Sequence, residues 1–291
     1  MDNHQLAVTN AKLVSFCSSL GSPGKSSLAC AIATELSDSG KRVLVIDADT
    51  YAPSIDVLLG LNDHPAGLAA ACRLVSQERF DLEQLQRLSV ELDVGGNQLM
   101  VMTGLSSSSR WAEVTPQKLC QIIDVAKPHF DYILLDVASC IEGQIASPQS
   151  SVERNSISRW AISNSDQVLV ISGADPVSIA RYLDFMSQMG DLKPAGEVLT
   201  IVNRLRTSVL GSSAKQQIVE TVSSLGQLQV AGFVPDDAAA ADAALKGSIS
   251  IALSKRSSQA RLAISLFTKS KILGERNPLD RRLFRSVAKL G

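Results

Sequence analysis

The chain has 291 residues, of which 45% are hydrophobic and 20% charged, so it can bury a large core. Its formal net charge of −1 gives no general attraction to nucleic acid or to an anionic membrane. Five scattered cysteines without a Cys-x-x-Cys pair, and isolated histidines, argue against a zinc site and favour reduced thiols. With no signal-peptide pattern and no apolar run near the roughly 20 residues that cross a bilayer, we expect a cytoplasmic protein.

Strand-like and helix-like segments alternate along the whole chain. The length alone suggests about two domains, but the composition marks no linker between them. We therefore expect one α/β domain over residues 1–291.

A short apolar run from Leu13 to Phe16 leads into a loop that has the composition of a phosphate-binding loop. An alanine- and leucine-rich stretch at 28–36, typical of a helix, follows it. In this strand-loop-helix context, backbone N–H groups and the helix dipole converge on an anion. The loop residues expected to surround the phosphates are Gly21, Ser22, Pro23, Gly24, Lys25, Ser26 and Ser27.

Two side chains of this loop carry the expected chemistry. Lys25 is expected to reach the terminal phosphates as a point charge, and the Ser26 hydroxyl to bind Mg²⁺. Ser19 stands where the usual loop pattern has its first glycine, so a chance Gly-Lys-Ser at a helix start is the alternative.

Carboxylates follow two aliphatic strands. The strand at 42–47 ends in Asp47, with Asp49 two residues later, and the strand at 130–136 ends in Asp136. Ligands of open α/β sheets gather at the carboxyl ends of the strands. A large apolar strand that ends in Asp is also the general form of the element that holds Mg²⁺ opposite a phosphate loop. A solvated turn at 47–51 is the alternative interpretation.

The middle of the chain carries fewer signals. Residues 65–92 are mostly helical in pattern and are expected to cover the sheet, and Pro116 begins a further helix. Arg154 and Asn155, in a Ser-rich stretch, either cross a dimer interface or form a solvated helix start.

The last two predicted strands end in polar residues. The strand at 198–204 ends in Asn203, whose amide can donate to and accept from a purine. No Asn-Lys-x-Asp motif is present, which favours ATP over GTP. The strand at 230–236 ends in Pro235 and Asp236, and Asp236 can alternatively cap the next helix.

The end of the chain, 278–291, is basic and amphipathic. Such a helix can lie on an anionic membrane or close the domain as a packed helix.

Together these motifs resemble the MinD/ParA group of P-loop ATPases, nearest its divergent CpaE-like branch of actinobacterial type. The loop is similar to the deviant loop Lys-Gly-Gly-x-Gly-Lys-Thr-Ser/Thr, with Ser22 at the second glycine and Leu20 at the signature lysine. Asp47-x-Asp49 resembles the switch I element, and the strand that ends in Asp136 resembles the Walker B strand.

The resemblance implies a three-layer α/β/α fold, with a mostly parallel sheet, helices on both faces and ATP at the carboxyl edge of the strands. It implies that Asp49 orients the attacking water, and that Asp47, Ser26 and Asp136 lie at Mg²⁺. It also implies that Asn203, Pro235 and Asp236 lie beside the adenine.

The family's activity implies an ATP-dependent homodimer that positions a division site, a pilus assembly or a chromosome with a protein partner still to be identified. The tail 278–291 would give peripheral contact with the inner face of the membrane. Because Leu20 cannot supply the charge of the signature lysine, we expect slow hydrolysis, or binding without turnover, unless a partner supplies an arginine.

Three other functions remain open. A degenerate scaffold or localisation factor of the same fold is the main alternative. A small-molecule kinase is weaker, since no arginine-rich lid is visible in the sequence. Nucleic-acid binding has no positive support, because Arg204, Arg206 and Lys215 are equally explained as scattered solvated charges.

Overall fold

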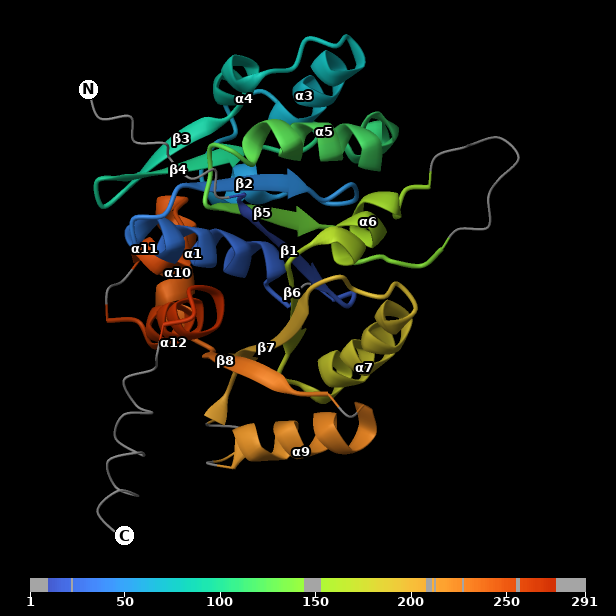
Figure 1. Ribbon diagram of the computed structural model, residues 1–291. Helices are drawn as coiled ribbons and strands as arrows, with labels where there is room; N and C mark the ends of the chain where they lie inside the picture. Colours follow the sequence, from blue (N-terminus) through green and yellow to red (C-terminus); the bar gives the residue numbers. More distant parts are fainter. Residues whose placement is uncertain are drawn as a thin grey trace, which may run out of the picture.

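The computed structural model describes residues 10–21, 23–143, 153–207, 211, 213–226, 228–254 and 257–275. They form an eight-stranded sheet in the order β3-β4-β2-β5-β1-β6-β7-β8, with helices on both faces (Figure 1). All neighbouring strands pair in parallel except β3 and β4. This arrangement confirms the predicted three-layer fold. The predictions for Ser22 and for a helix at 278–291 lie outside the described residues.

The strands are β1 (Lys12–Ser18), β2 (Val43–Ala48), β3 (Val90–Val94), β4 (Asn97–Met102), β5 (Tyr132–Val137), β6 (Gln167–Gly173), β7 (Glu197–Leu205) and β8 (Val230–Pro235). The helices are α1 (Lys25–Asp38), α2 (Ile55–Leu58), α3 (Gly67–Ser76), α4 (Leu82–Leu88), α5 (Pro116–Ala126), α6 (Ser156–Asn164), α7 (Pro176–Gly190), α9 (Ala214–Gly226), α10 (Ala238–Gly247), α11 (Ile251–Ser254) and α12 (Gln259–Phe267). Short turns of 3-10 and π helix, η1 (Ser108–Glu113) and η2 (Thr268–Ile272), complete them.

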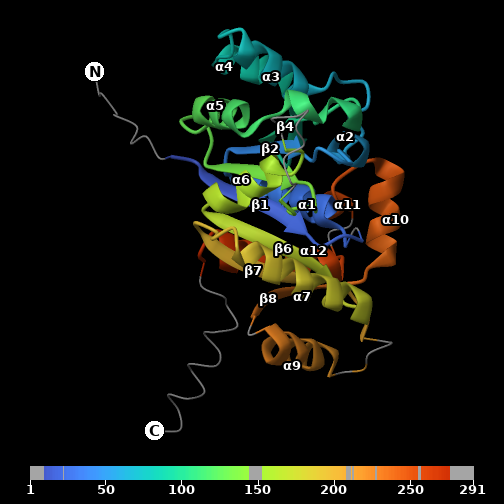
Figure 2. The ribbon, with the colours of Figure 1, turned by 90° about the vertical axis from the view of Figure 1, so that its right-hand side faces the viewer.

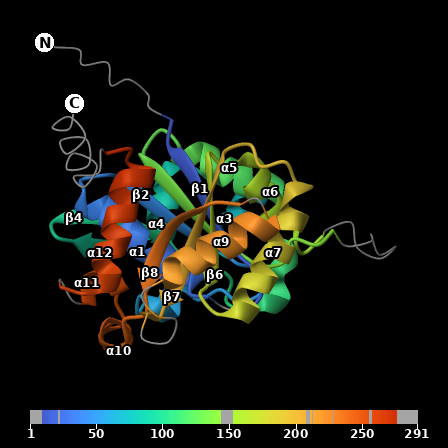
Figure 3. The ribbon, with the colours of Figure 1, turned by 90° about the horizontal axis from the view of Figure 1, so that it is seen from below.

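The sheet separates two apolar layers, because successive side chains of a strand point to opposite faces. On β1, Leu13 and Cys17 pack in the layer that contains α3, α5, α6, α7 and α9, whereas Val14 and Phe16 pack in the layer of α1 and α12. Figure 3 shows these two groups of helices on either side of the strands. Both faces of the central strands are therefore buried, as expected of a parallel sheet.

The segment 65–92, predicted to be mostly helical, contains α3 and α4 but ends in a strand. Its last residues begin β3, which pairs antiparallel with β4. Gly95 and Gly96 connect the two strands with φ values of 59° and 88°, as a tight hairpin turn requires. The helical leucine spacing before β3 conceals this change, and the glycine pair is the signal that marks the hairpin.

The chain changes direction around β1, which lies between β5 and β6. Strands β2 to β5 lie on one side of β1 and β6 to β8 on the other. In Figure 2, β2 and β4 are seen on one side of β1, and β6, β7 and β8 on the other. Such a switch point opens a crevice at the carboxyl ends of the strands. The fold thus brings together the loops that follow β1, β2, β5, β6 and β7. None of the described helices combines the length and hydropathy needed to span a membrane.

Candidate functional site

The loop between β1 and α1 has the backbone shape that its glycines allow. Gly21 has a φ of 118° and Gly24 a φ of 88°, and both values lie in the left-handed region. A Cβ atom at Gly24 would lie 2.6 Å from the Asn203 side-chain nitrogen, so the position also needs glycine for space. The Asn203 Nδ2 atom donates to the Pro23 carbonyl oxygen at 2.7 Å, which ties the end of β7 to the loop.

A buried charge cluster lies at the start of α1. The Lys25 Nζ atom donates to Asp136 Oδ1 at 2.6 Å and to Asp49 Oδ2 at 3.4 Å, and the Ser26 hydroxyl donates to Asp136 Oδ2 at 2.5 Å. Lys25 is 6% exposed and Asp136 is fully buried. Burial acts to lower the pKa of Lys25, but the charges of Asp136 and Asp49 outweigh burial and raise this pKa. The lysine therefore stays charged in the interior.

The two carboxylates after β2 have different surroundings. Asp49 Oδ1 accepts from the backbone amides of Tyr51 and Ala52, each at 2.9 Å, so that its other oxygen faces Lys25. Asp47 pairs in register with Asp136 across β2 and β5, but its oxygens accept from the amides of residues 49, 54 and 55. Burial and the charge of Asp136 raise the pKa of Asp47 to about 7. That Asp47 contributes to metal binding stays a prediction.

The oxygens of Ser26 and Asp136 suit Mg²⁺. This ion prefers hard oxygen ligands and is commonly held by one or two carboxylates, substrate phosphates and waters. The Ser26 hydroxyl and Asp136 already lie in contact at the N-terminus of α1. Among the described residues, no three His, Cys, Asp or Glu side chains form a cation site by themselves. A Mg²⁺ ion here would therefore depend on oxygens from a phosphate ligand.

The other side of the loop is open and only partly polar. A hollow of about 110 Å³ adjoins Gly24, Ser27, Asn203, Pro235 and Asp236, so the structure brings the predicted base-binding residues together beside the loop. Asp236 accepts from Arg206 Nε at 2.6 Å. The cap of α10 is Asp237, whose side chain accepts from the Ala240 amide, so the alternative role of Asp236 as the helix cap is wrong by one residue.

Comparisons with known proteins agree with this geometry. Residues 14–251 match the model of the CobQ/CobB/MinD/ParA nucleotide binding domain. The chain belongs to this family, and it is of the MinD/ParA type of P-loop ATPase. The septum site-determining protein MinD of Bacillus subtilis is 25% identical over 229 residues, which cover 75% of this chain and 73% of that protein. MinD of Helicobacter pylori is 26% identical over 272 residues, 91% of each chain.

Solved structures of MinD and ParA proteins share the fold. A ParA family ATPase from Chlorobium tepidum has a TM-score of 0.72 at 19% identity and covers 89% of this chain and 98% of its own. MinD of Pyrococcus horikoshii complexed with Mg-ADP has a TM-score of 0.65 at 17% identity and covers 91% and 98%. The family model confirms the predicted family, whereas the CpaE-like branch stays a prediction.

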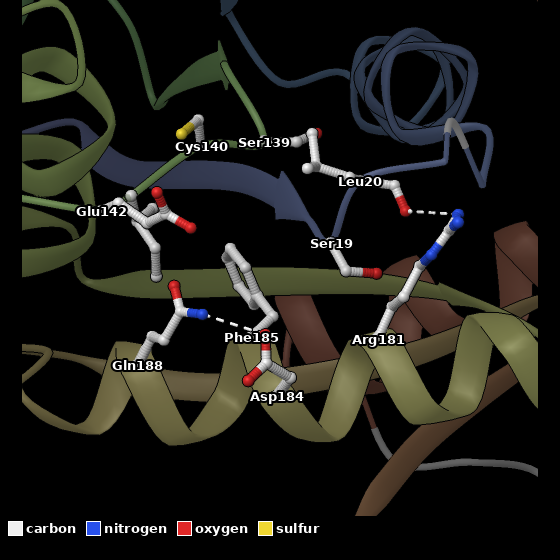
Figure 4. Close-up of a pocket in the computed structure, with 10 residues that line it drawn as sticks. Ser19, Leu20, Ser139, Cys140, Glu142, Arg181, Asp184, Phe185 and Gln188 are labelled. Carbon is white, nitrogen blue, oxygen red and sulfur yellow. Dashed lines mark hydrogen bonds between the residues drawn. The ribbon is translucent and has the colours of Figure 1, made fainter.

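Leu20 departs from the MinD/ParA loop, and its side chain is 66% exposed. Figure 4 shows its carbonyl oxygen facing Arg181 of α7, whose Nη1 atom donates to it at 3.4 Å. A hollow of about 120 Å³ extends from here to Cys140 and Glu142. No sequence pattern marks Arg181, because its contact joins residues that are 161 positions apart along the chain.

The structure places Arg154 and Asn155 at the start of α6, against loops of the same chain. Arg154 lies over the Tyr51 ring, with its Cζ atom 3.8 Å from the ring centre, and Asn155 is 1% exposed. Asn155 begins α6 but is buried, so a solvated helix start is wrong for this residue, whereas a role of the two residues at a dimer interface stays a prediction. The Ser-rich sequence around these residues has no helical or strand periodicity that would predict their contacts with distant loops.

Proposed function

We propose that the chain binds ATP with Mg²⁺ at the carboxyl end of β1, hydrolyses ATP slowly, and uses the bound nucleotide to control a homodimer that positions other machinery. The observation that carries the proposal is the buried contact of Lys25 and Ser26 with Asp136, at the start of α1 and beside the glycine loop. Phosphate oxygens carry the same negative charge as the carboxylates that now contact Lys25, so a bound nucleotide can take their place.

Each residue has a role that follows from its position. The loop amides and Lys25 hold the phosphates, and Ser26 and Asp136 hold Mg²⁺, with Asp47 beside them. Bound Mg²⁺ supplies positive charge that stabilises the phosphate oxygens. Asp49, whose carboxylate is fixed by the amides of Tyr51 and Ala52, orients the attacking water.

The base is proposed to lie in the hollow beside Asn203. The Asn203 amide donates to the Pro23 carbonyl of the loop, and Asn203, Pro235 and Asp236 line the same hollow. An amide offers both a donor and an acceptor to the edge of adenine. The placement of all three residues along one hollow supports ATP as the ligand.

Slow turnover follows from the loop sequence. Leu20 supplies no positive charge to the transferred phosphate, and the loss of one such cation removes several kcal/mol, on the order of 3, of transition-state stabilisation. We therefore expect little phosphate release from the protein alone. Brisk release in a coupled assay without any partner would contradict this expectation.

The positioning role rests on the relatives. They include septum site-determining MinD proteins, and one similar structure is a MinC:MinD cell division complex of Aquifex aeolicus, with a TM-score of 0.66 and 22% identity. We propose that this chain acts likewise as a nucleotide-dependent dimeric switch with a protein partner, in cell division, pilus assembly or chromosome partitioning. Membrane contact through 278–291 stays part of this proposal.

A non-hydrolysing scaffold of the same fold is the second candidate, and the exposed Leu20 favours it. Titration calorimetry with Mg-ATP tests the nucleotide binding on which the switch depends, and a phosphate-release assay tests the hydrolysis that the scaffold lacks. The switch predicts binding that Lys25→Met abolishes and that Lys41→Met, on an exposed residue at the opposite edge of the sheet, leaves unchanged. A folded wild-type protein that gives no heat at millimolar Mg-ATP would overturn the proposal and leave the scaffold.

A further inference from the structure

The start of α6 binds two loops of the candidate site at once. The first, here called the Asp49 loop, comprises residues 49–52 after β2. The second, the Asp136 loop, comprises residues 138–142 after β5. Asp49 and Asp136 both contact Lys25, and the Asp136 loop begins two residues after Asp136, at the end of β5. The Asp49 loop therefore carries one carboxylate of the charge cluster itself, and the Asp136 loop continues directly from the strand end that carries the other.

On the Asp49 loop, Arg154 contacts the neighbouring residues Thr50 and Tyr51. Its guanidinium lies on the face of the Tyr51 ring and its Nη2 atom donates to the Thr50 carbonyl at 2.9 Å. The Thr50 hydroxyl donates in return to the Arg154 carbonyl at 3.3 Å. The Arg154 Nε atom is buried and has no hydrogen-bond partner among the described residues. The position of the guanidinium therefore depends on its contacts with Tyr51 and Thr50.

Asn155 joins the two loops through one side chain. Its Oδ1 atom accepts from the Tyr51 hydroxyl at 2.7 Å, and its Nδ2 atom donates to the Glu142 carbonyl at 2.8 Å and to Cys140 Sγ at 3.2 Å. The next turn of α6 holds the same loop, since Ser158 donates to the Ala138 carbonyl and Arg159 to the Ile141 carbonyl.

Helix capping does not explain this side chain. An asparagine at the N-cap usually accepts a hydrogen bond from an amide of the first turn. Asn155 occupies the N-cap of α6, yet its side chain makes no such bond. The side-chain oxygen of Asn155 instead accepts from the Asp49 loop, and its side-chain nitrogen donates to the Asp136 loop.

We propose that Asn155, supported by Arg154, is a positioning residue that couples the Asp49 loop to the Asp136 loop, so that the two loops change conformation together. Loss of the hydrogen bond from Asn155 to one loop then also loosens the other loop. The consequence for the proposed function is that a ligand sensed at Asp136 also resets Asp49, the residue that orients water.

The structure offers a conservative variant and a matched control. Tyr51→Phe removes the hydroxyl that bonds to Asn155 and keeps the ring under Arg154. Tyr182→Phe makes the same chemical change in the core, where the Tyr182 hydroxyl bonds to Thr200 away from both loops. Asn155→Ala removes both sides of the bridge.

Two measurements on nucleotide-free protein read the loops separately. Hydrogen exchange of the Tyr51 and Ala52 amides, both bonded to Asp49, reports on the Asp49 loop. Alkylation of the partly exposed thiol of Cys140, located by mass spectrometry, reports on the Asp136 loop. Cys120 on α5, also partly exposed, is the internal reference in the same sample.

We expect Tyr51→Phe to raise the alkylation rate of Cys140 relative to Cys120 by about threefold to tenfold, the population change that loss of one hydrogen bond produces. Asn155→Ala should raise it at least as much, and Tyr182→Phe should leave it unchanged. If Tyr51→Phe speeds exchange at Tyr51 and Ala52 while Cys140 keeps its wild-type rate, the loops are independent and the proposal is overturned.

A further readout rests on the proposed function. In Tyr51→Phe, kcat for ATP hydrolysis should fall while the Kd for Mg-ATP stays at the wild-type value. The reason is that the variant changes the orientation of the Asp49 carboxylate and leaves the phosphate loop intact. A purely stabilising role would lower the Tm in Tyr51→Phe and Tyr182→Phe alike and leave kcat unchanged. Absence of ATP binding in the wild type would refute the proposed function but not the coupling measured without nucleotide.

Discussion

On the phosphate side of the candidate site the charged groups are buried, whereas on the base side the Arg206 and Asp236 side chains are 63% and 31% exposed. The side chains of Lys25 and Asp136 are only 7% and 0% exposed, and each has a charged or hydroxyl partner in the interior. A charge held in low dielectric responds strongly to loss of its partner, whereas an exposed pair contributes little. The comparison teaches that loss of a charge should destabilise the protein far more at Lys25 than at Arg206.

The largest effect should come from Lys25→Met. It leaves Asp136 and Asp49 without their cation, which for a buried pair costs about 3–5 kcal/mol of unfolding free energy. Arg206→Met, on the base side, should cost less than about 1 kcal/mol. Urea denaturation of both variants at neutral pH checks the contrast, and equal losses would break it.

A smaller effect is expected on the rate of ATP hydrolysis. Leu20→Lys restores a cation at an exposed position without disturbing the core, and should raise the hydrolysis rate about tenfold, less than the loss usually seen when an electrostatic group is deleted. Leu225→Lys, on the exposed face of α9, is the control. A phosphate-release assay that shows no gain for Leu20→Lys would remove Leu20 as the cause of slow turnover.

Asn203→Ala tests the base side directly. It removes the amide that is proposed to bind adenine and that now bonds to the Pro23 carbonyl, so the Kd for Mg-ATP should rise about tenfold. Asn164→Ala removes an exposed amide that bonds only within α6 and should change nothing. Preference for ATP over GTP should weaken only in Asn203→Ala, and an unchanged preference would argue against Asn203 as the base-reading residue.

The smallest effect concerns pH. Hydrogen bonds from Ser258 and backbone amides lower the pKa of Asp237, the cap of α10. A lowered pKa in the folded state means that ionised Asp237 stabilises the fold above its unfolded pKa, and that this contribution is lost as the pH falls. Asp237→Asn, which keeps a capping group, should cost about 0.5 kcal/mol at pH 7 and nothing in strong acid. Thermal melts across this range measure the difference, and a cost independent of pH would contradict it.

The sequence was informative where chemistry is local. The loop glycines, the strand that ends in Asp136 and the alternation of elements were sufficient to predict the fold and to name the residues that meet at Lys25. Contacts between distant segments were not predictable. Neither the bridge by Asn155, more than 100 residues from Tyr51 along the chain, nor the approach of Arg181 to Leu20 leaves a periodic pattern.

The most direct test is a crystal structure of the protein with Mg²⁺ and a slowly hydrolysed ATP analogue. The account predicts that the phosphates lie against residues 21–27, that Lys25 Nζ leaves Asp136 for a phosphate oxygen, and that the base lies beside Asn203. A nucleotide bound elsewhere, or a Lys25 that still contacts Asp136 while the analogue is bound, would contradict it.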